Sequence, residues 1–165
     1  MLAYENIHRL GYQRIGLVTD ETKIQLSGHF FEGGYLMAQR IAGDDAVRVP
    51  VCAIDSGAIF RQGKVITSWI KKHKVDAIFT DIAQVLELLQ AEGMKVPEDV
   101  GIAVTTVLDA KVDAGIDQHP EEIGRVGFLM LNSLINDGAR GIPRIFRQIL
   151  VEGSWVDGKC LPPRK

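Results

Sequence analysis

The chain has 165 residues, of which 46% are hydrophobic and 24% charged, and its formal net charge is −2. This length suits one domain with a substantial core, and the charge balance gives no basic field that would favour nucleic acid. No apolar run reaches the roughly 20 residues needed to cross a bilayer, and residues 1–6 lack the features of a signal peptide. Cys52 and Cys160 lack metal-ligand spacing. We therefore expect a cytoplasmic protein with reduced thiols, no metal and no cofactor.

The first two thirds of the chain alternate between strand and helix patterns. The apolar spacing predicts, in order, a helix at 3–10, a strand at 14–19, a polar loop at 20–27, a helix at 30–41, a strand at 47–54, a helix at 65–70, a strand at 75–79, a helix at 82–92 and a strand at 100–105. Pro50 interrupts hydrogen bonding in its strand and indicates an edge position. This alternation is typical of right-handed crossovers in a parallel sheet. The predicted fold is therefore an α/β three-layer sandwich with a mostly parallel sheet.

Residues 75–93 are the clearest repeat of this pattern. An apolar strand run ends at the polar pair Thr80–Asp81, and a helical pattern starts at Ile82 and stops at Gly93. We expect Asp81 to cap that helix through its carboxylate. Open α/β sheets bind ligands outside the carboxyl ends of their strands. The loops at that edge are therefore the candidate site.

The pattern changes after residue 108. Residues 111–118 have no regular period, and Pro120 suits the first turn of a helix that continues to Ile135. Residues 126–131 of this helix are apolar all round, so the helix must be covered on more than one side. Residues 147–151 are predicted to be the last strand, followed by a tail at 153–165.

Three segments together resemble lac-repressor-type transcription regulators. They are residues 8–17 (HRLGYQRIGL), 76–81 (DAIFTD) and 92–102 (EGMKVPEDVGI). In addition, Asp117–Gln118 is similar to a crossover between the two subdomains of that family. The resemblance implies a periplasmic-binding-protein-like (type I) effector domain. Residues 1–108 and 145–160 would form its C-terminal subdomain core, and residues 109–144 the crossover strand and helix of an otherwise absent N-terminal subdomain.

The resemblance also implies a function without catalysis. A member of this family would bind a small-molecule effector, a carbohydrate or a related metabolite, and would form a homodimer. It would contact DNA only through a helix-turn-helix headpiece, which these residues do not contain. Two departures bear on the effector. Phe31 stands where the family usually has an arginine that grips sugar hydroxyls, and Asp109 is the single substitute for a usual pair of aspartates.

Five residues are predicted to contact the ligand. They are Ser27, Phe31, Asp81, Asp109 and Gln118. The topology would place Ser27, Asp81 and Asp109 along one rim of the sheet. Each also has a simpler interpretation: Asp81 as a helix cap, Phe31 as core packing, Ser27 and Gln118 as solvated positions.

A rival hypothesis from another class is a receiver-like phosphoacceptor domain. It would bind magnesium through Asp20 and Glu21 and accept a phosphoryl group on Asp81, assisted by Thr105 or Thr106 and by Lys111. Asp81 in a loop with cap character and the length of the chain disfavour it. A secreted solute-binding protein is a third alternative, disfavoured by the N-terminal sequence.

Overall fold

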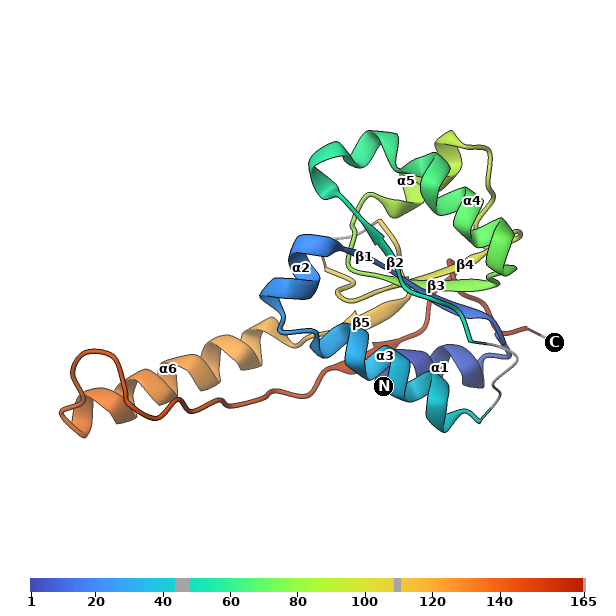
Figure 1. The fold of residues 1–165 in the computed structure, drawn as a ribbon. Coiled ribbons are helices and arrows are strands. Elements are labelled where there is room, and N and C mark those ends of the chain that lie inside the picture. Colours follow the sequence, from blue (N-terminus) through green and yellow to red (C-terminus); the bar gives the residue numbers. More distant parts are fainter. Residues whose placement is uncertain (44–47, 109–110, 165) are drawn as a thin grey trace. The chain divides into compact units, whose positions relative to one another are not determined.

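The described strands form one mostly parallel sheet (Figure 1). The computed structural model describes residues 1–43, 48–108 and 111–164. The strands are β1 (Ile15–Asp20), β2 (Cys52–Ile54), β3 (Ala77–Thr80), β4 (Gly101–Val104), β5 (Gly115–Asp117) and β6 (Ser154–Val156), in the spatial order β2-β1-β3-β4-β5-β6. The pairs from β2 to β5 are all parallel. The carboxyl ends of these five strands therefore lie at one edge of the sheet, which we call the carboxyl edge.

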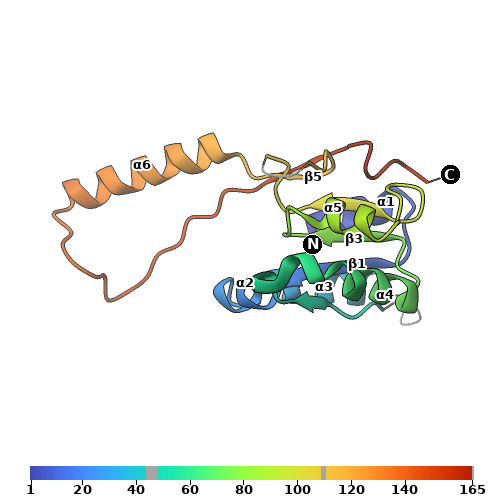
Figure 2. The ribbon, with the colours of Figure 1, turned by 90° about the horizontal axis from the view of Figure 1, so that it is seen from above.

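Helices cover both faces of this sheet. The helices of the first unit are α1 (Leu2–Arg9), α2 (Glu21–Leu26), α3 (Phe30–Ile41), the 3-10 helix η2 (Ser56–Arg61), α4 (Gly63–His73) and α5 (Val85–Ala91). A further helix, α6 (Pro120–Asn136), belongs to a separate unit described below. Helices α1 and α3 lie on one face and α4 and α5 on the other, as Figure 1 shows. In the view from above, β1 and β3 run side by side (Figure 2). The predicted three-layer α/β architecture is confirmed.

Successive residues of a strand point to opposite faces of the sheet, so the buried side chains form one cluster on each face. On β1 and β3, Val18 and Ile78 pack in a cluster with α4 and α5. Their neighbours Leu17 and Ala77 pack in a second cluster with α1 and α3. Because parallel strands covered on both faces bury successive residues, these strands read as continuous apolar runs in the sequence.

Four local predictions were wrong, and each error has a physical reason. Asp81 does not cap the helix after β3, because that helix, α5, starts too far along the chain: its N-cap is Gln84, with no side-chain cap hydrogen bond. The helix expected from Ile82 begins at Val85, because the Thr80 hydroxyl accepts the Ile82 amide at 3.1 Å and closes a turn first. The strand expected at 147–151 is irregular, and the last strand is β6. The loop expected at 20–27 contains α2, which Asp20 caps by accepting the amides of Thr22 and Lys23.

The edge position predicted for the strand around Pro50 is confirmed, because β2 is the outermost strand on its side. The described part of that segment becomes a strand only at Cys52. Residue 47 of the predicted strand lies outside the described residues.

The chain divides into two units. The first unit comprises Met1–Asp117 and Trp155–Lys165, and the second comprises Gln118–Ser154. The second unit contains α6, in which no residue is buried. Large apolar side chains of α6, among them Phe128 and Leu131, are more than half exposed. The sequence-based expectation that this helix needs a cover therefore applies to the structure as well.

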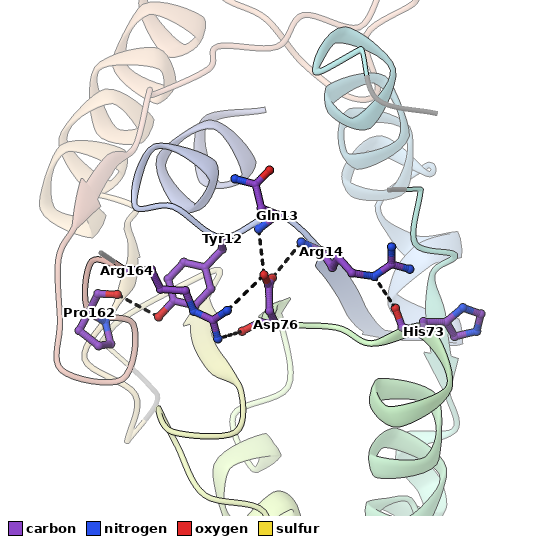
Figure 3. Close-up of polar contacts among 7 residues, drawn as sticks. All are labelled: Tyr12, Gln13, Arg14, His73, Asp76, Pro162 and Arg164. Carbon is purple, nitrogen blue, oxygen red and sulfur yellow. Dashed lines mark hydrogen bonds and ion pairs between the residues drawn. The ribbon is translucent and has the colours of Figure 1, made fainter. Parts of the chain in front are cut away.

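A polar network fastens the end of the chain to the opposite edge of the sheet (Figure 3). Asp76 accepts the backbone amides of Gln13 and Arg14, both at 2.9 Å, and pairs with the Arg164 guanidinium at 3.3 Å. The same guanidinium lies 4.5 Å from the ring centroid of Tyr12, whose hydroxyl donates to the carbonyl of Pro162. These contacts hold the start of β1 and the C-terminal segment in place. None of the residues in this network lies at the carboxyl edge.

Candidate functional site

Asp81 follows β3 directly and brings a partly desolvated carboxylate to the carboxyl edge. Its side chain is 15% exposed, and Oδ2 lies 3.7 Å from the Lys23 ammonium. The same ammonium donates to the Asp81 carbonyl at 2.7 Å. Within the described residues, Oδ1 is buried and has no hydrogen-bond partner. An unpartnered buried acceptor is costly, and a ligand hydroxyl would relieve that cost.

The surroundings of Asp81 favour its protonated form. Burial raises the pKa of the Asp81 carboxyl above its ordinary value, and the nearby carboxylate of Asp20 adds to the rise. The Lys23 ammonium and the nearby Thr19 side chain act in the opposite direction. Desolvation outweighs them, which is the usual result for a carboxyl group whose charge is only partly compensated.

Asp81 lies on the same face of the sheet as α1 and α3. Residues two apart in a strand point to the same side, and Ala77 and Phe79 both pack with the α1–α3 cluster. Continuing that alternation brings the next odd position, Asp81, to the same side. Thr19, which contacts Asp81, follows the same parity after Leu17 on β1. Asp81 and Thr19 therefore lie on the side of the sheet that α1 and α3 cover.

Two other predicted site residues lie in the first unit. Ser27 follows α2 as its C-terminal cap, and its hydroxyl donates to the carbonyl of Ile24 at 3.1 Å. Phe31 lies in the first turn of α3, half exposed, against an apolar hollow that Phe79 also lines. Ser27 and Asp81 thus follow the carboxyl ends of neighbouring strands, β1 and β3, as their places in the chain require.

The structure does not determine how the remaining two predicted residues, Asp109 and Gln118, lie relative to these three. Asp109 lies outside the described residues. Gln118 is exposed and belongs to the second unit, directly after β5. Their contact with a ligand stays a prediction.

Two residues of the rival phosphoacceptor hypothesis, Asp20 and Lys111, make other contacts. Asp20 is 1% exposed, and its carboxylate caps α2. Lys111 pairs with Glu87 at 2.9 Å. Across the described ranges, no group of three His, Cys, Asp or Glu side chains could hold a metal ion. This arrangement disfavours magnesium-dependent phosphoryl transfer at Asp81.

Sequence reasoning missed Lys23 and Thr19 as neighbours of Asp81. Thr19 could have been found from strand parity, since it lies two residues after Leu17 on the strand beside β3. Lys23 could not, because its position depends on the short helix α2, whose sequence carries no clear apolar period.

The sequence matches the family described as periplasmic binding protein-like domain over residues 4–156. The chain belongs to this family. It has the α/β architecture expected of a member, with a mostly parallel sheet. No curated protein matches the chain in sequence.

Solved structures share this fold at low sequence identity. A LacI-family transcriptional regulatory protein from Corynebacterium glutamicum is 21% identical, with a TM-score of 0.66, and the match covers 99% of this chain and 64% of that one. The transcriptional regulator CelR in complex with cellobiose is 21% identical, with a TM-score of 0.66 and coverages of 96% and 50%. A LacI family regulator from Enterococcus faecium with bound ribose is 15% identical, with a TM-score of 0.62 and coverages of 98% and 61%.

This chain therefore spans between half and two thirds of the length of the solved structures it matches. The fold agrees with the one that the resemblance to lac-repressor-type regulators implies. In the part of the chain that the structure describes, no helix has the length and apolar character required to traverse a lipid bilayer.

Proposed function

We propose that this chain is the effector-binding and dimerisation module of a lac-repressor-type transcription regulator, and that it is not an enzyme. The observation that carries the proposal is the buried, unpartnered Oδ1 of Asp81 at the carboxyl edge, beside the Lys23 ammonium. A carboxylate oxygen accepts hydrogen bonds from ligand hydroxyls, and the ammonium donates to ligand oxygens. This pair suits a polyhydroxylated small molecule.

Two relatives in fold support a carbohydrate or a related metabolite as the effector. The matched structures include one with cellobiose and one with ribose. We assign Ser27, Phe31 and Asp81 to one side of the effector cleft, and Asp109 and Gln118 to contacts made from the segments that follow β4 and β5. DNA recognition and a cytoplasmic location are parts of the same proposal, with DNA contacted by a separate helix-turn-helix segment.

Sugar titration of the isotope-labelled 165-residue chain tests this proposal. We expect a panel of pentoses, hexoses and disaccharides to shift the backbone amide resonances of Lys23 and of the residues around Asp81. The dissociation constant should be on the order of 1 mM or weaker, because one side of a cleft buries only part of a ligand that a complete pocket would enclose.

Matched variants make the result specific. Asp81→Asn should weaken the shifts, because the amide keeps one acceptor oxygen and replaces the other with a group that only donates. Asp137→Asn, the same change at an exposed position after α6, should leave them unchanged. Absence of shifts at the carboxyl edge with every sugar would refute the effector site. Nanomolar binding by these residues alone would refute the assignment to one side of a cleft.

A further inference from the structure

We propose that the effector carries an apolar or aromatic ring beside its hydroxyl groups, and that this ring binds in a hollow next to Asp81. The hollow has a volume of about 90 Å³, and its wall includes five aromatic side chains: Tyr4, Phe30, Phe31, Tyr35 and Phe79. We call it the aromatic hollow. This inference rests on the proposed function and adds the chemical class of the ligand.

The floor of the aromatic hollow is fixed in advance. The Tyr35 hydroxyl is a hydrogen-bond donor to two backbone carbonyls, that of Val49 at 2.7 Å and that of Ile15 at 3.1 Å. Tyr4 meets the Tyr35 ring edge-on, with centroids 6.1 Å apart. A ligand ring would therefore meet rings that are already held in place, and binding would not require them to be ordered first.

The opening of the hollow includes two solvent-exposed aromatic side chains. Phe30 and Phe31 are 76% and 50% exposed. Covering these rings removes apolar area from water, and aromatic rings add edge or offset stacking to that gain. A sugar hydroxyl placed among them would lose hydrogen bonds to water without replacement. The hollow therefore selects the apolar part of a ligand.

The aromatic hollow and the Asp81–Lys23 pair are linked through β3, because Phe79 lines the hollow and Asp81 follows the end of the same strand. Phe79 precedes Asp81 by two residues in the same segment, which corresponds to roughly 6–7 Å along a strand. By strand parity both face the α1–α3 side of the sheet. One ligand can thus place hydroxyl groups at Asp81 and Lys23 and a ring against Phe79 and Phe31. Aryl glycosides and nucleoside-like molecules have this composition.

The size of the hollow favours a single ring as occupant. A cavity of about 150 Å³ encloses benzene completely, so this smaller, open hollow admits one ring from its edge. A protein partner would need an interface of about 1,000 Å². The aromatic hollow alone is therefore too small for such a partner.

Paired glycosides test the inference on the 165-residue chain. Methyl and phenyl β-D-glucopyranoside share the sugar and differ in the ring, and phenol supplies the ring alone. We expect the phenyl glycoside to bind about tenfold more tightly than the methyl glycoside, a difference of about 1.4 kcal/mol. The ring resonances of Phe79 and Tyr35 should shift with the phenyl glycoside and with phenol.

Two adjacent glycines provide the matched variants. Gly34 lines the aromatic hollow, whereas a Cβ at Gly33 would point into open space. Gly34→Ala and Gly33→Ala should both raise the melting temperature, because alanine is the better helix former. Only Gly34→Ala should remove the tenfold preference, since its methyl group enters the hollow. Phe31→Ala, which removes a half-exposed wall, should remove it too.

The outcomes separate this inference from the function on which it rests. Equal affinity for the two glycosides, or a preference that survives Gly34→Ala, overturns the ring site and leaves the proposed function standing. If phenol shifts the ring resonances and no sugar or glycoside shifts the carboxyl edge, the effector function itself is overturned, and with it the ligand class.

Discussion

Asp81 links the candidate site to the stability of the protein through its pKa. Because burial raises this pKa above 3.8, the folded state keeps the proton to a higher pH than the unfolded chain. Between the two pKa values the folded state binds more protons, so stability falls as pH rises. Each unit of displacement corresponds to about 1.4 kcal/mol.

We expect the free energy of unfolding of the wild type, relative to Asp81→Asn, to decrease as the pH rises above about 4. Urea unfolding of both proteins across this range measures the difference. A difference that stays constant or grows with pH would show that the Lys23 ammonium outweighs burial at this position.

Asp76 and Arg164 should contribute unequally to stability, although they form one ion pair. Asp76→Ala removes the acceptor of two backbone amides and should cost about 2 kcal/mol, because those donors lose their partner. Arg164→Ala removes a pair whose guanidinium side is 39% exposed and a contact with Tyr12, together about 1 kcal/mol. Denaturant titrations that reversed this order would contradict the assignment of Asp76 to the backbone.

At the scale of elements, the sequence predicts most strongly where both faces of a strand are buried. The runs around Leu17, Ile78 and Ile102 are apolar at successive positions, which indicated a covered parallel sheet. The pattern failed where a local polar contact replaced apolar periodicity. Asp20 starts α2 and Thr80 delays α5 through side-chain hydrogen bonds, and neither contact leaves a periodic signal.

The same limit applies to the candidate site. Asp81 could be found from its place after a strand, because topology alone brings that position to the ligand-binding edge. Its partner Lys23 is 58 residues away in sequence, and the aromatic hollow combines residues from α1, α3 and two strands. Such combinations depend on three-dimensional packing, which a single sequence does not encode in any local pattern.

Helix α6 carries the prediction that concerns assembly. Its large apolar side chains are exposed and none of its residues is buried, and exposed apolar patches mark interaction surfaces. We expect light scattering at high protein concentration to give a dimer. Phe128→Arg should shift the protein to monomer, whereas Ser133→Arg at an exposed polar position of the same helix should not. A strictly monomeric wild type would exclude α6 as a dimer contact.

At the scale of the whole molecule, the chain contributes to its main sheet from both ends. The C-terminal segment returns to the first unit, where the Cys160 carbonyl accepts the Ile102 amide at 2.9 Å and Asp113 accepts the amides of Lys159 and Cys160. Leu161 is 1% exposed. Backbone hydrogen bonds and a buried side chain thus hold this short segment against the sheet.

From this two-ended attachment we infer that the first unit would stay folded after a break in the backbone of the second unit. Residues 138–153 have no helix or strand, and Arg140, Arg144 and Arg147 are exposed sites for trypsin. A single cut there should yield two pieces that elute together on a native sizing column and separate only in denaturant. The cleaved protein would then be a non-covalent complex of a long N-terminal fragment and a short C-terminal fragment.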